Sequence, residues 1–356
     1  MTGLQSTDEF TAEQMLEIAS RKYTDPVTTL EPLDFEQRSG NELRPRTFDE
    51  MVGQERLKSL LRRIVENVRR SAAPLDHMLL VGSAGTGKTT TAQVIAHELG
   101  RRVYQVQAPI AQDVLEELAA VAEDGDVLIV DECHMWMKPD RRAGSPVATP
   151  EMVFAILEDQ RLQTKTGVVP FPAVTWIGCT TDAGLLPEPF LARFPLQPHL
   201  DPYSDEEMWQ LALDNAESLR MTIAPEAALV FAQACRETPR IINRYMRNAR
   251  QLAATDVDLD CALEIVRVLN STTLDGLDAD MQNMLRFLLR QERVDGKGNV
   301  RYQAGVNSIA TALGKSRDSK AVALYVEPWL IKQSYVSVTH GGRALTDAGV
   351  ERARQL

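Results

Sequence analysis

The sequence predicts an α/β fold with a parallel β-sheet core, followed by largely helical segments. Short apolar runs such as Met78–Val81 and Val127–Val130 are separated by stretches with helical spacing. A glycine-rich loop, Gly82–Thr89, lies between the first of these runs and the helical pattern Thr90–Leu99. The length of 356 residues suggests two or three compact units.

The glycine-rich loop reads G-x-x-x-x-G-K-T, with the strand before it and the helix after it that a phosphate-binding loop requires. Such a loop turns backbone N–H groups toward phosphates, and the helix N-terminus adds a favourable dipole. Lys88 is predicted to reach the β- and γ-phosphates, and the Thr89 hydroxyl to bind Mg²⁺. The alternative is a chance glycine-rich turn. We expect ATP and Mg²⁺ as cofactors, contacted by the loop residues Gly85, Gly87, Lys88, Thr89 and Thr90.

The composition is that of a globular chain that does not coat nucleic acid through bulk charge. Apolar residues make up 44% and charged residues 25%, and the formal net charge is −11. No apolar run approaches the ~20 residues that cross a bilayer. The N-terminus lacks a signal-peptide pattern, and the four cysteines show no C-x-x-C pairing. We therefore expect a cytoplasmic protein without a membrane partner.

The charge is distributed unevenly along the chain. Residues 1–42 hold 3 basic and 9 acidic side chains, whereas residues 271–356 hold 12 basic and 9 acidic ones. Any contact with DNA is therefore expected in the C-terminal part. The acidic N-terminal segment has one helical pattern, Ala12–Ala19, and then loses periodicity. It predicts either a partner-binding segment or a loosely ordered, partly disordered tail.

Two carboxylates, Asp131 and Glu132, follow a buried apolar run. Acids at such a strand end are costly unless they face a metal or a cleft; the alternative is a solvated turn. Beside a phosphate loop, Asp131 is expected to orient the Mg²⁺ shell, and Glu132 to position and polarise the attacking water. A later apolar run, 173–179, ends in Thr180 and Thr181. Their hydroxyls are predicted either to reach the γ-phosphate or the water, or to cap the next turn.

The second half of the chain is mostly helical in pattern. Residues 204–270 predict a small all-α domain, whose first helix has Ser204 and Glu207 at capping-box spacing. Residues 271–356 show helices followed by a strand-turn-strand that contains Gly341-Gly342. This order fits a winged helix, a common DNA-binding form that also serves in protein docking.

The entry segment Leu43–Gln54 carries a first family resemblance. It reads L-R-P-R-T-F-D-E-M-V-G-Q ahead of the phosphate loop and resembles the adenine-side segment of AAA+ ATPases. The resemblance implies an AAA+ P-loop core with a parallel sheet and a small helical lid domain. It also implies that Leu43 and Arg44 hold the base.

Later blocks resemble the RuvB family of Holliday-junction branch-migration motors. This resemblance implies an ATP hydrolase that works as a homo-oligomeric, hexameric ring on junction or branched DNA in recombination and repair. It covers the chain from about residue 43 to the C-terminus. The blocks that carry it are Leu75–His77, Gly178–Leu186, Pro189–Phe194, Thr238–Arg244 and Val326–Ile331.

The resemblance also implies roles for single residues. Arg193 matches the arginine finger that one subunit inserts into its neighbour's site, where its charge offsets that of the transferring phosphoryl group. Arg240 matches the sensor arginine of the lid, which touches the γ-phosphate within the same subunit. Tyr203 matches a nucleotide-contacting tyrosine, and Glu158 and Asp159 match a nucleotide-side acidic pair. Without such a match, a surface arginine is usually a solvated charge.

Two departures from the family pattern change the expected partners. The family's long apolar hairpin docks the junction-binding protein RuvA, whereas residues 161–172 are short and polar and extra residues occur at 138–150. We therefore expect no tight RuvA partnership and leave the adaptor open. The family's wing arginines are reduced to Arg343, with Arg317 and Lys320 as further DNA-binding candidates. Fewer phosphate contacts predict weaker, less salt-sensitive binding. A divergent or viral relative fits both changes.

The predicted function is an ATP-driven motor of the RuvB type on DNA. One alternative is an AAA+ loader or remodeller that places another protein on DNA. Another is a nucleotide-gated DNA-binding switch, against which the intact Glu132 argues. The expected segments are an N-terminal extension 1–42, a large ATPase domain 43–203, a helical lid 204–270 and a winged helix 271–356.

Overall fold

The computed structural model describes residues 30–35, 42–71, 74–137, 147–253, 255–294, 300–315 and 319–356. Within them the chain divides into two compact units, each assembled from separate stretches. The first contains the described parts of 1–35, 64–80 and 95–198, and the second those of 36–63, 81–94 and 199–356. No helix in these described ranges is both long and apolar enough to cross a membrane.

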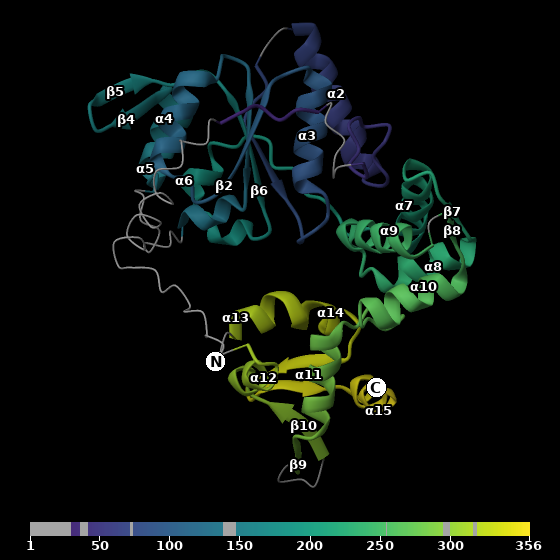
Figure 1. Cartoon of the computed structure of the whole chain (residues 1–356). Helices are drawn as coiled ribbons and strands as arrows, with labels where there is room; N and C mark the ends of the chain where they lie inside the picture. The colour runs from purple at the N-terminus through teal and green to yellow at the C-terminus, as the bar shows by residue number, and fades with distance from the viewer. Residues whose placement is uncertain are drawn as a thin grey trace, which may run out of the picture. The chain divides into compact units, whose positions relative to one another are not determined.

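A four-stranded sheet organises the first unit (Figure 1). Its strands have the order β1-β6-β3-β2. β2 pairs with β3 and β3 pairs with β6, both in parallel register. All residues of β6 are buried, as is every apolar residue of β3, which is typical of parallel strands covered on both faces. The strands are β1 (Met78–Val81), β2 (Val103–Gln107), β3 (Val127–Asp131) and β6 (Thr175–Thr180).

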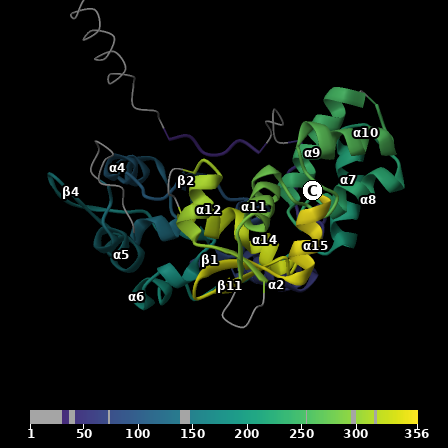
Figure 2. The same ribbon diagram turned by 90° about the horizontal axis from the view of Figure 1, so that it is seen from below.

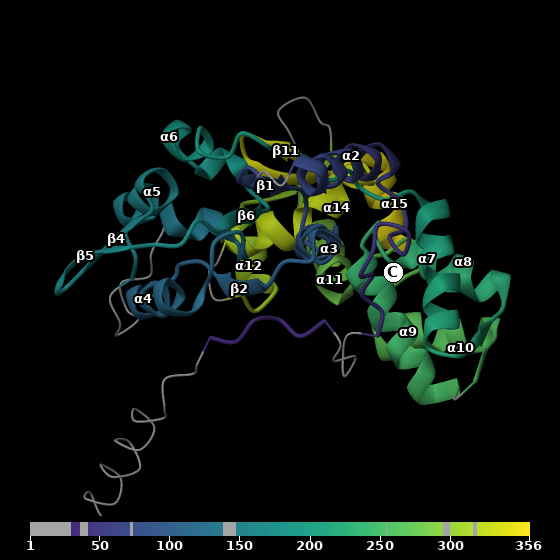
Figure 3. The ribbon, with the colours of Figure 1, turned by 90° about the horizontal axis from the view of Figure 1, so that it is seen from above.

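Helices connect the strands of this sheet. The predicted hairpin is also present, and it consists of β4 (Arg161–Thr164) and β5 (Gly167–Pro170). Figures 1 and 3 show the hairpin beside α4 and α5. Short 3-10 turns follow β3 and β6, at Cys133–Met137 and Ala183–Leu185. The helices are α2 (Glu55–Ser71), α3 (Lys88–Leu99), α4 (Gln112–Val121), α5 (Pro150–Asp159) and α6 (Glu188–Leu191).

Part of the N-terminal extension lies along β2, the edge strand of the sheet. The Leu33 N–H donates to the Val103 carbonyl at 2.7 Å, and the Phe35 ring meets His97 edge-on at 5.2 Å. Residues 30–35 therefore have specific partners in the first unit, because the edge strand offers backbone groups that need partners. The rest of the extension, with the predicted helix Ala12–Ala19, lies outside the described residues apart from Glu42.

The lid predicted from helical patterns forms in the second unit, and Figure 2 shows its helices together. Its capping box is present: the Glu207 N–H donates to Ser204 Oγ at 3.1 Å, and the Ser204 N–H donates to Glu207 Oε2 at 2.8 Å. The predicted last helix is α10 followed by a π-helical turn, Ile265–Leu269. The elements are α7 (Asp205–Ser218), β7 (Thr222–Ile223), α8 (Pro225–Ala234), α9 (Pro239–Ala253), β8 (Asp256–Val257) and α10 (Leu259–Glu264).

The C-terminal region has the predicted helices and hairpin, with two strands and a last helix that the patterns did not reveal. Its sheet has the order β11-β12-β10-β9. Gly342 is required where β12 pairs with β10, because a Cβ there would lie 2.1 Å from the Ala304 carbonyl oxygen. The helical stretch from residue 319 to residue 332 consists of α13, a π-helical turn Val322–Val326 and α14. The elements are α11 (Ala279–Leu289), β9 (Glu292–Val294), β10 (Val300–Ala304), α12 (Val306–Ala312), α13 (Ser319–Ala321), α14 (Glu327–Lys332), β11 (Val336–Thr339), β12 (Gly342–Leu345) and α15 (Asp347–Gln355).

Candidate nucleotide site

The phosphate-binding loop belongs to the second unit, between β1 and α3. Gly85 and Gly87 have φ angles of 83° and 97°, a region that residues with a Cβ rarely enter. Lys88 is only 7% exposed, and its Nζ donates to the carbonyls of Gly82 and Ser83 at 2.9 Å each. The lysine is thus held within the loop that it is predicted to complete.

Tyr203 lies beside this loop. A Cβ at Gly87 would be 3.7 Å from the Tyr203 hydroxyl. Burial, together with the nearby Glu207 carboxylate, raises the pKa of Tyr203 to about 12. The hydroxyl therefore keeps its proton over a wider pH range than an ordinary tyrosine and can donate a hydrogen bond.

The entry segment is fixed to the residues just before the lid by Gln54, a residue that the sequence patterns did not single out. Its Nε2 donates to the Asp201 carbonyl at 2.6 Å, and the Asp201 N–H donates to its Oε1 at 3.1 Å. Close packing adds to this, since a Cβ at Gly53 would lie 2.8 Å from the Tyr203 ring. The segment predicted to hold the base is thereby tied to the tyrosine predicted to contact the nucleotide.

The other nucleotide candidates of this unit come from three elements. Leu43 is 6% exposed and packs in the lid core, while Arg44 Nη1 donates to Gln93 Oε1 on α3 at 3.4 Å. Arg240 lies on the first turn of α9, with its Cβ 3.5 Å from the position of a Cβ on Gly85. Thr89 and Thr90 are half-buried at the start of α3.

The predicted catalytic acids belong to the first unit, at the carboxyl end of β3. Asp131 Oδ2 accepts a hydrogen bond from Gln105 Nε2 at 2.7 Å. Gln105 is a second contact that the patterns missed, although a glutamine within an apolar strand is a usable signal. Glu132 has a φ angle of 51°, and such left-handed backbone at a non-glycine residue is concentrated at functional sites.

Histidine and hydroxyl side chains surround Glu132. Because the carboxyl ends of β3 and β6 meet at one edge, Thr180 and Thr181 come close to the acid. His134 Nδ1 lies 3.1 Å from Thr180 Oγ1 and 3.4 Å from Glu132 Oε2. Thr181 Oγ1 donates to Glu132 Oε2 at 3.4 Å. His134 is thus a neighbour of the acid and links it to the buried Thr180 hydroxyl.

Arg193 and Glu158, which were given separate roles, form an ion pair in this chain. Arg193 Nη2 lies 2.7 Å from Glu158 Oε1, and its guanidinium carbon lies 4.1 Å from the centre of the Phe154 ring. Arg193 Nη1 also donates to the Pro189 carbonyl. Asp159 is exposed at the end of α5. Glu158 therefore contacts the predicted finger within its own subunit, a partner that the resemblance did not imply.

The DNA-binding candidates differ in position. Lys320 is exposed on α13, and Arg317 lies outside the described residues. Arg343 stays a DNA-binding prediction, and in this chain its Nη2 pairs with Glu327 Oε2 at 2.8 Å while its side chain is 17% exposed. Glu327 is 3% exposed. Withdrawing the arginine would leave a buried carboxylate without its cation, which is costly.

No group of three or more His, Cys, Asp or Glu side chains in the described ranges could hold a metal by itself. The predicted Mg²⁺ ligands are instead the Thr89 hydroxyl and the Asp131 carboxylate. Both are hard oxygen donors, and Mg²⁺ commonly binds through one or two protein oxygens with substrate phosphates and water. Each of the two is therefore a donor of the kind that a nucleotide-bound Mg²⁺ takes.

A parallel sheet with a phosphate-binding loop, acids at the end of β3 and a helical lid carrying Arg240 define a P-loop ATPase of the AAA+ class. Family models match almost the whole chain in order: the Holliday junction DNA helicase RuvB P-loop domain at 43–200, the RuvB AAA lid domain at 203–278 and the RuvB C-terminal winged helix domain at 275–353. The chain therefore belongs to the RuvB family, which confirms the resemblance and the predicted fold class.

Individual relatives agree with this assignment. A protein from Rubrobacter xylanophilus, named Holliday junction branch migration complex subunit RuvB, is 33% identical over 320 residues, covering 89% of this chain and 88% of the relative. A protein of the same name from Nocardioides sp. is 33% identical over 353 residues, covering 95% and 93%. The solved Thermotoga maritima RuvB Holliday junction branch migration motor has a TM-score of 0.72 at 27% identity, covering 88% of this chain and 99% of that one.

Proposed function

We propose that this protein is an ATP-driven motor of the RuvB type that acts on Holliday junctions or other branched DNA. One observation carries the proposal. The three RuvB family models match in order from residue 43 to residue 353, and the matched core retains Lys88, Glu132 and Arg240. A chain that only bound nucleotide would not need an acid at position 132. A hexameric ring of identical subunits, as the family pattern implies, and a cytoplasmic location are parts of this proposal.

In this proposal ATP is bound across the residues described above. Lys88 contacts the β- and γ-phosphates, and Arg240 contacts the γ-phosphate from the lid. Mg²⁺, when bound, neutralises charge on the phosphates, and Glu132 orients the attacking water. Leu43 and Arg44 are assigned to the base, and Tyr203 is assigned to the nucleotide. Gly85, Gly87 and Thr90 are assigned to the phosphates, Thr180 and Thr181 to the γ-phosphate or the attacking water, and Thr89 and Asp131 to Mg²⁺.

Turnover is proposed to need a neighbouring subunit, because Arg193 is assigned to the neighbour's site. Within one chain its guanidinium contacts Glu158 and Phe154. We propose that these contacts hold the finger in a defined position, with Glu158 and Asp159 on the nucleotide-facing side of the subunit boundary. DNA contact is assigned to the winged helix 271–356, with Lys320 and Arg317 as the candidate residues. The other proposed segments are the N-terminal extension 1–42, the large ATPase domain 43–203 and the helical lid 204–270.

The proposal is tested with the purified full chain, a labelled four-way DNA junction, and either ATP or a non-hydrolysable analogue. We expect ATP hydrolysis and ATP-dependent conversion of the junction to duplex products, and rings in electron micrographs with the analogue. The Lys88→Ala protein is the control and should lack both activities. ATP hydrolysis without any junction processing over a range of protein and salt concentrations would contradict a motor that works on DNA by itself.

A loader or remodeller is the second candidate, and the wing supports it. Val338 is 59% exposed and lies opposite Arg343 in the β11–β12 register, while Arg343 pairs with Glu327. An exposed valine at this position is better suited to a protein surface than to phosphates. Junction processing by the chain alone would favour the motor, and processing only after addition of a second protein would favour the loader.

A further inference from the structure

The connection between α8 and α9 has an unusual backbone. Arg236 and Glu237 have φ angles of 56° and 55°, and two successive non-glycine residues in this region are rare. The Thr238 hydroxyl donates to the Arg236 carbonyl at 2.8 Å, which closes the turn. Backbone of this kind persists only where its surroundings hold it. The turn is followed at once by Pro239 and Arg240 at the start of α9.

One side of this turn packs against the phosphate-binding loop. A Cβ at Gly85 would lie 2.6 Å from Thr238 Cγ2 and 3.5 Å from Arg240 Cβ. The first distance is too short for any real side chain, so the two loops leave no space between them. A shift of the phosphate loop must therefore be accommodated by Thr238 or Arg240.

The other side of the turn is bound to the C-terminal domain by two ion pairs. Arg236 Nη1 lies 2.8 Å from Asp278 Oδ2, with side-chain exposures of 20% and 33%. Lys332 Nζ donates to Glu237 Oε1 at 2.6 Å. Asp278 caps α11 by accepting from the Met281 N–H at 3.0 Å. The Arg236 stem also leaves no room at Gly276, where a Cβ would be 2.7 Å from Arg236 Cγ.

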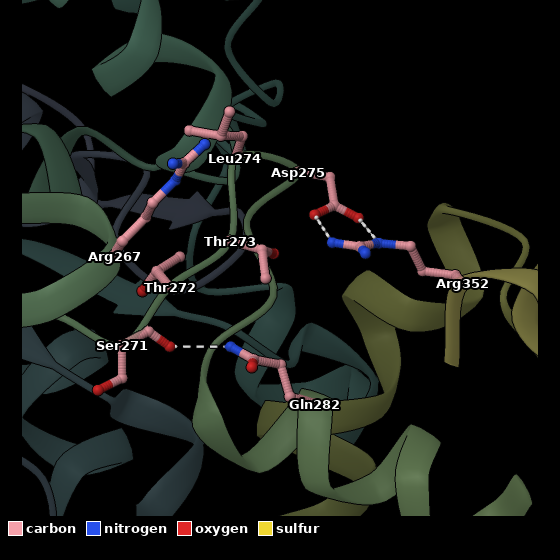
Figure 4. A pocket seen from close by; sticks show the side chains of 8 residues that line it. All are labelled: Arg267, Ser271, Thr272, Thr273, Leu274, Asp275, Gln282 and Arg352. Carbon is pink, nitrogen blue, oxygen red and sulfur yellow. Dashed lines mark hydrogen bonds and ion pairs between the residues drawn. The ribbon is translucent and has the colours of Figure 1, made fainter. Parts of the chain in front are cut away.

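The segment that joins the lid to the winged helix is itself fastened to the winged helix (Figure 4). Asp275 accepts from Arg352 Nε and Nη2 at 2.8 Å and 2.7 Å and from the Tyr335 hydroxyl at 3.0 Å. Gln282 Nε2 donates to the Ser271 carbonyl at 2.9 Å. The connecting segment thus has specific partners in the winged helix. A displacement of Arg236 would therefore also displace the winged-helix residues to which this segment is hydrogen-bonded.

We propose that Arg236 and Glu237 are positioning residues that couple Arg240 and the phosphate loop to the winged helix. The ion pairs with Asp278 and Lys332 fix the position of the turn. The turn then fixes the positions of Thr238 and Arg240 beside Gly85. The nucleotide state thereby changes the affinity for DNA, and DNA changes the affinity for nucleotide by the same factor. The inference rests on the proposed function, since it requires that ATP and DNA bind to this chain.

The test measures affinity of the full chain for a labelled four-way junction, once with a non-hydrolysable ATP analogue and once with ADP. The ratio of the two affinities is the coupling factor. In the wild-type protein we expect a ratio of about 5 or more. In Arg236→Gln and in Glu237→Lys the ratio should fall toward one, while both variants still bind the ATP analogue and the junction when each ligand is measured alone.

Rescue distinguishes a positioning role from a general loss of structure. Adding Lys332→Glu to Glu237→Lys restores opposite charges and should return most of the ratio, and Arg236→Lys should retain part of it. The matched control is Glu98→Gln, because Glu98 is 21% exposed and pairs with Arg69 at 3.5 Å, while Glu237 is 22% exposed. This control should keep the wild-type ratio.

The outcomes separate the inference from the proposed function. A wild-type ratio above one that persists in both Arg236→Gln and Glu237→Lys would overturn the inference and leave the motor intact. A wild-type protein that binds both ligands with a ratio of one would also overturn it. Absence of ATP binding or of DNA binding in the wild-type protein would instead reject the proposed function, and the inference with it.

Discussion

Lys88 and Glu132 are assigned to different parts of one reaction, and single substitutions can separate them. Lys88 is buried within the phosphate loop, so Lys88→Ala should abolish tight ATP binding. Glu132→Gln keeps the size of the side chain and loses its charge. It should retain ATP binding and lower hydrolysis by about 10²- to 10⁴-fold, the usual range for a group that handles a proton or water.

The measurement is a titration with a fluorescent ATP analogue beside a steady-state hydrolysis assay. Glu151→Gln is a suitable control, because Glu151 is an exposed acid in the first turn of α5 with no assigned role. Equal loss of nucleotide affinity in the Lys88 and Glu132 variants would mean that Glu132 binds nucleotide rather than positions water.

At the scale of elements, the segment between the lid and the winged helix depends on Asp275. Burial by itself would raise the pKa of this carboxyl, but hydrogen bonds from Arg352, Thr273 and Tyr335 and the Arg352 charge outweigh it and lower the pKa to about 2. The stabilisation is therefore complete above the ordinary value near 4 and is lost as the pH falls from about 4 toward 2.

Asp275→Asn should remove this stabilisation, on the order of 1–2 kcal/mol at neutral pH. The difference in melting temperature between wild type and variant should shrink as the pH falls below about 4. Asp280→Asn is the control, since Asp280 is 41% exposed in its ion pair with Lys315, and exposed pairs contribute little. A difference that stays constant from pH 7 to the acid limit would contradict the role given to Asp275.

The β4–β5 hairpin bears on the choice of partner. Of the apolar side chains of the hairpin, Leu162 is fully buried. Val168, at 59% exposure, is the one large apolar side chain that the hairpin exposes. Interface energy usually concentrates in a few buried apolar or aromatic anchors. We therefore predict no tight binding to a bacterial RuvA and no stimulation by it.

A pull-down with RuvA should compare the full chain with a version that lacks residues 1–29. This truncation leaves in place residues 30–35, which lie along β2. Micromolar or tighter binding by the full chain would refute the prediction, and loss of that binding on truncation would place the docking site in the acidic N-terminal segment.

At the scale of the whole assembly, Arg193 is expected to act in a neighbouring subunit. Arg193→Ala should leave ATP binding nearly unchanged and lower ring-dependent hydrolysis by about 10³-fold or more. Mixing this variant with Lys88→Ala protein should restore part of the activity, because some interfaces then pair an intact site with an intact finger.

The mixing ratio should be varied while the masses of mixed rings are measured. Glu158→Gln provides a second comparison: it removes the partner of Arg193 within the chain and retains the finger. No recovery at any ratio, with mixed rings demonstrably formed, would place Arg193 in its own subunit's site.

The sequence by itself determined the ATPase core, because its motifs are local. The strand, glycine loop and helix around Lys88, and the acids at the end of β3, occur at fixed spacing along the chain. Backbone geometry at Gly85 and Gly87 follows from the same local pattern. The lid helices were also predictable, since Ser204 and Glu207 form a capping box within four residues.

Tertiary structure decided what distant residues do to one another. Arg343 was expected to face DNA, but its register beside Val338 and the buried Glu327 give it a partner inside the domain. The contacts of Arg236 with Asp278 and of Glu237 with Lys332 join residues 42 and 95 positions apart. No periodicity encodes such pairs, because an ion pair depends on where two chain segments meet and not on spacing within either one.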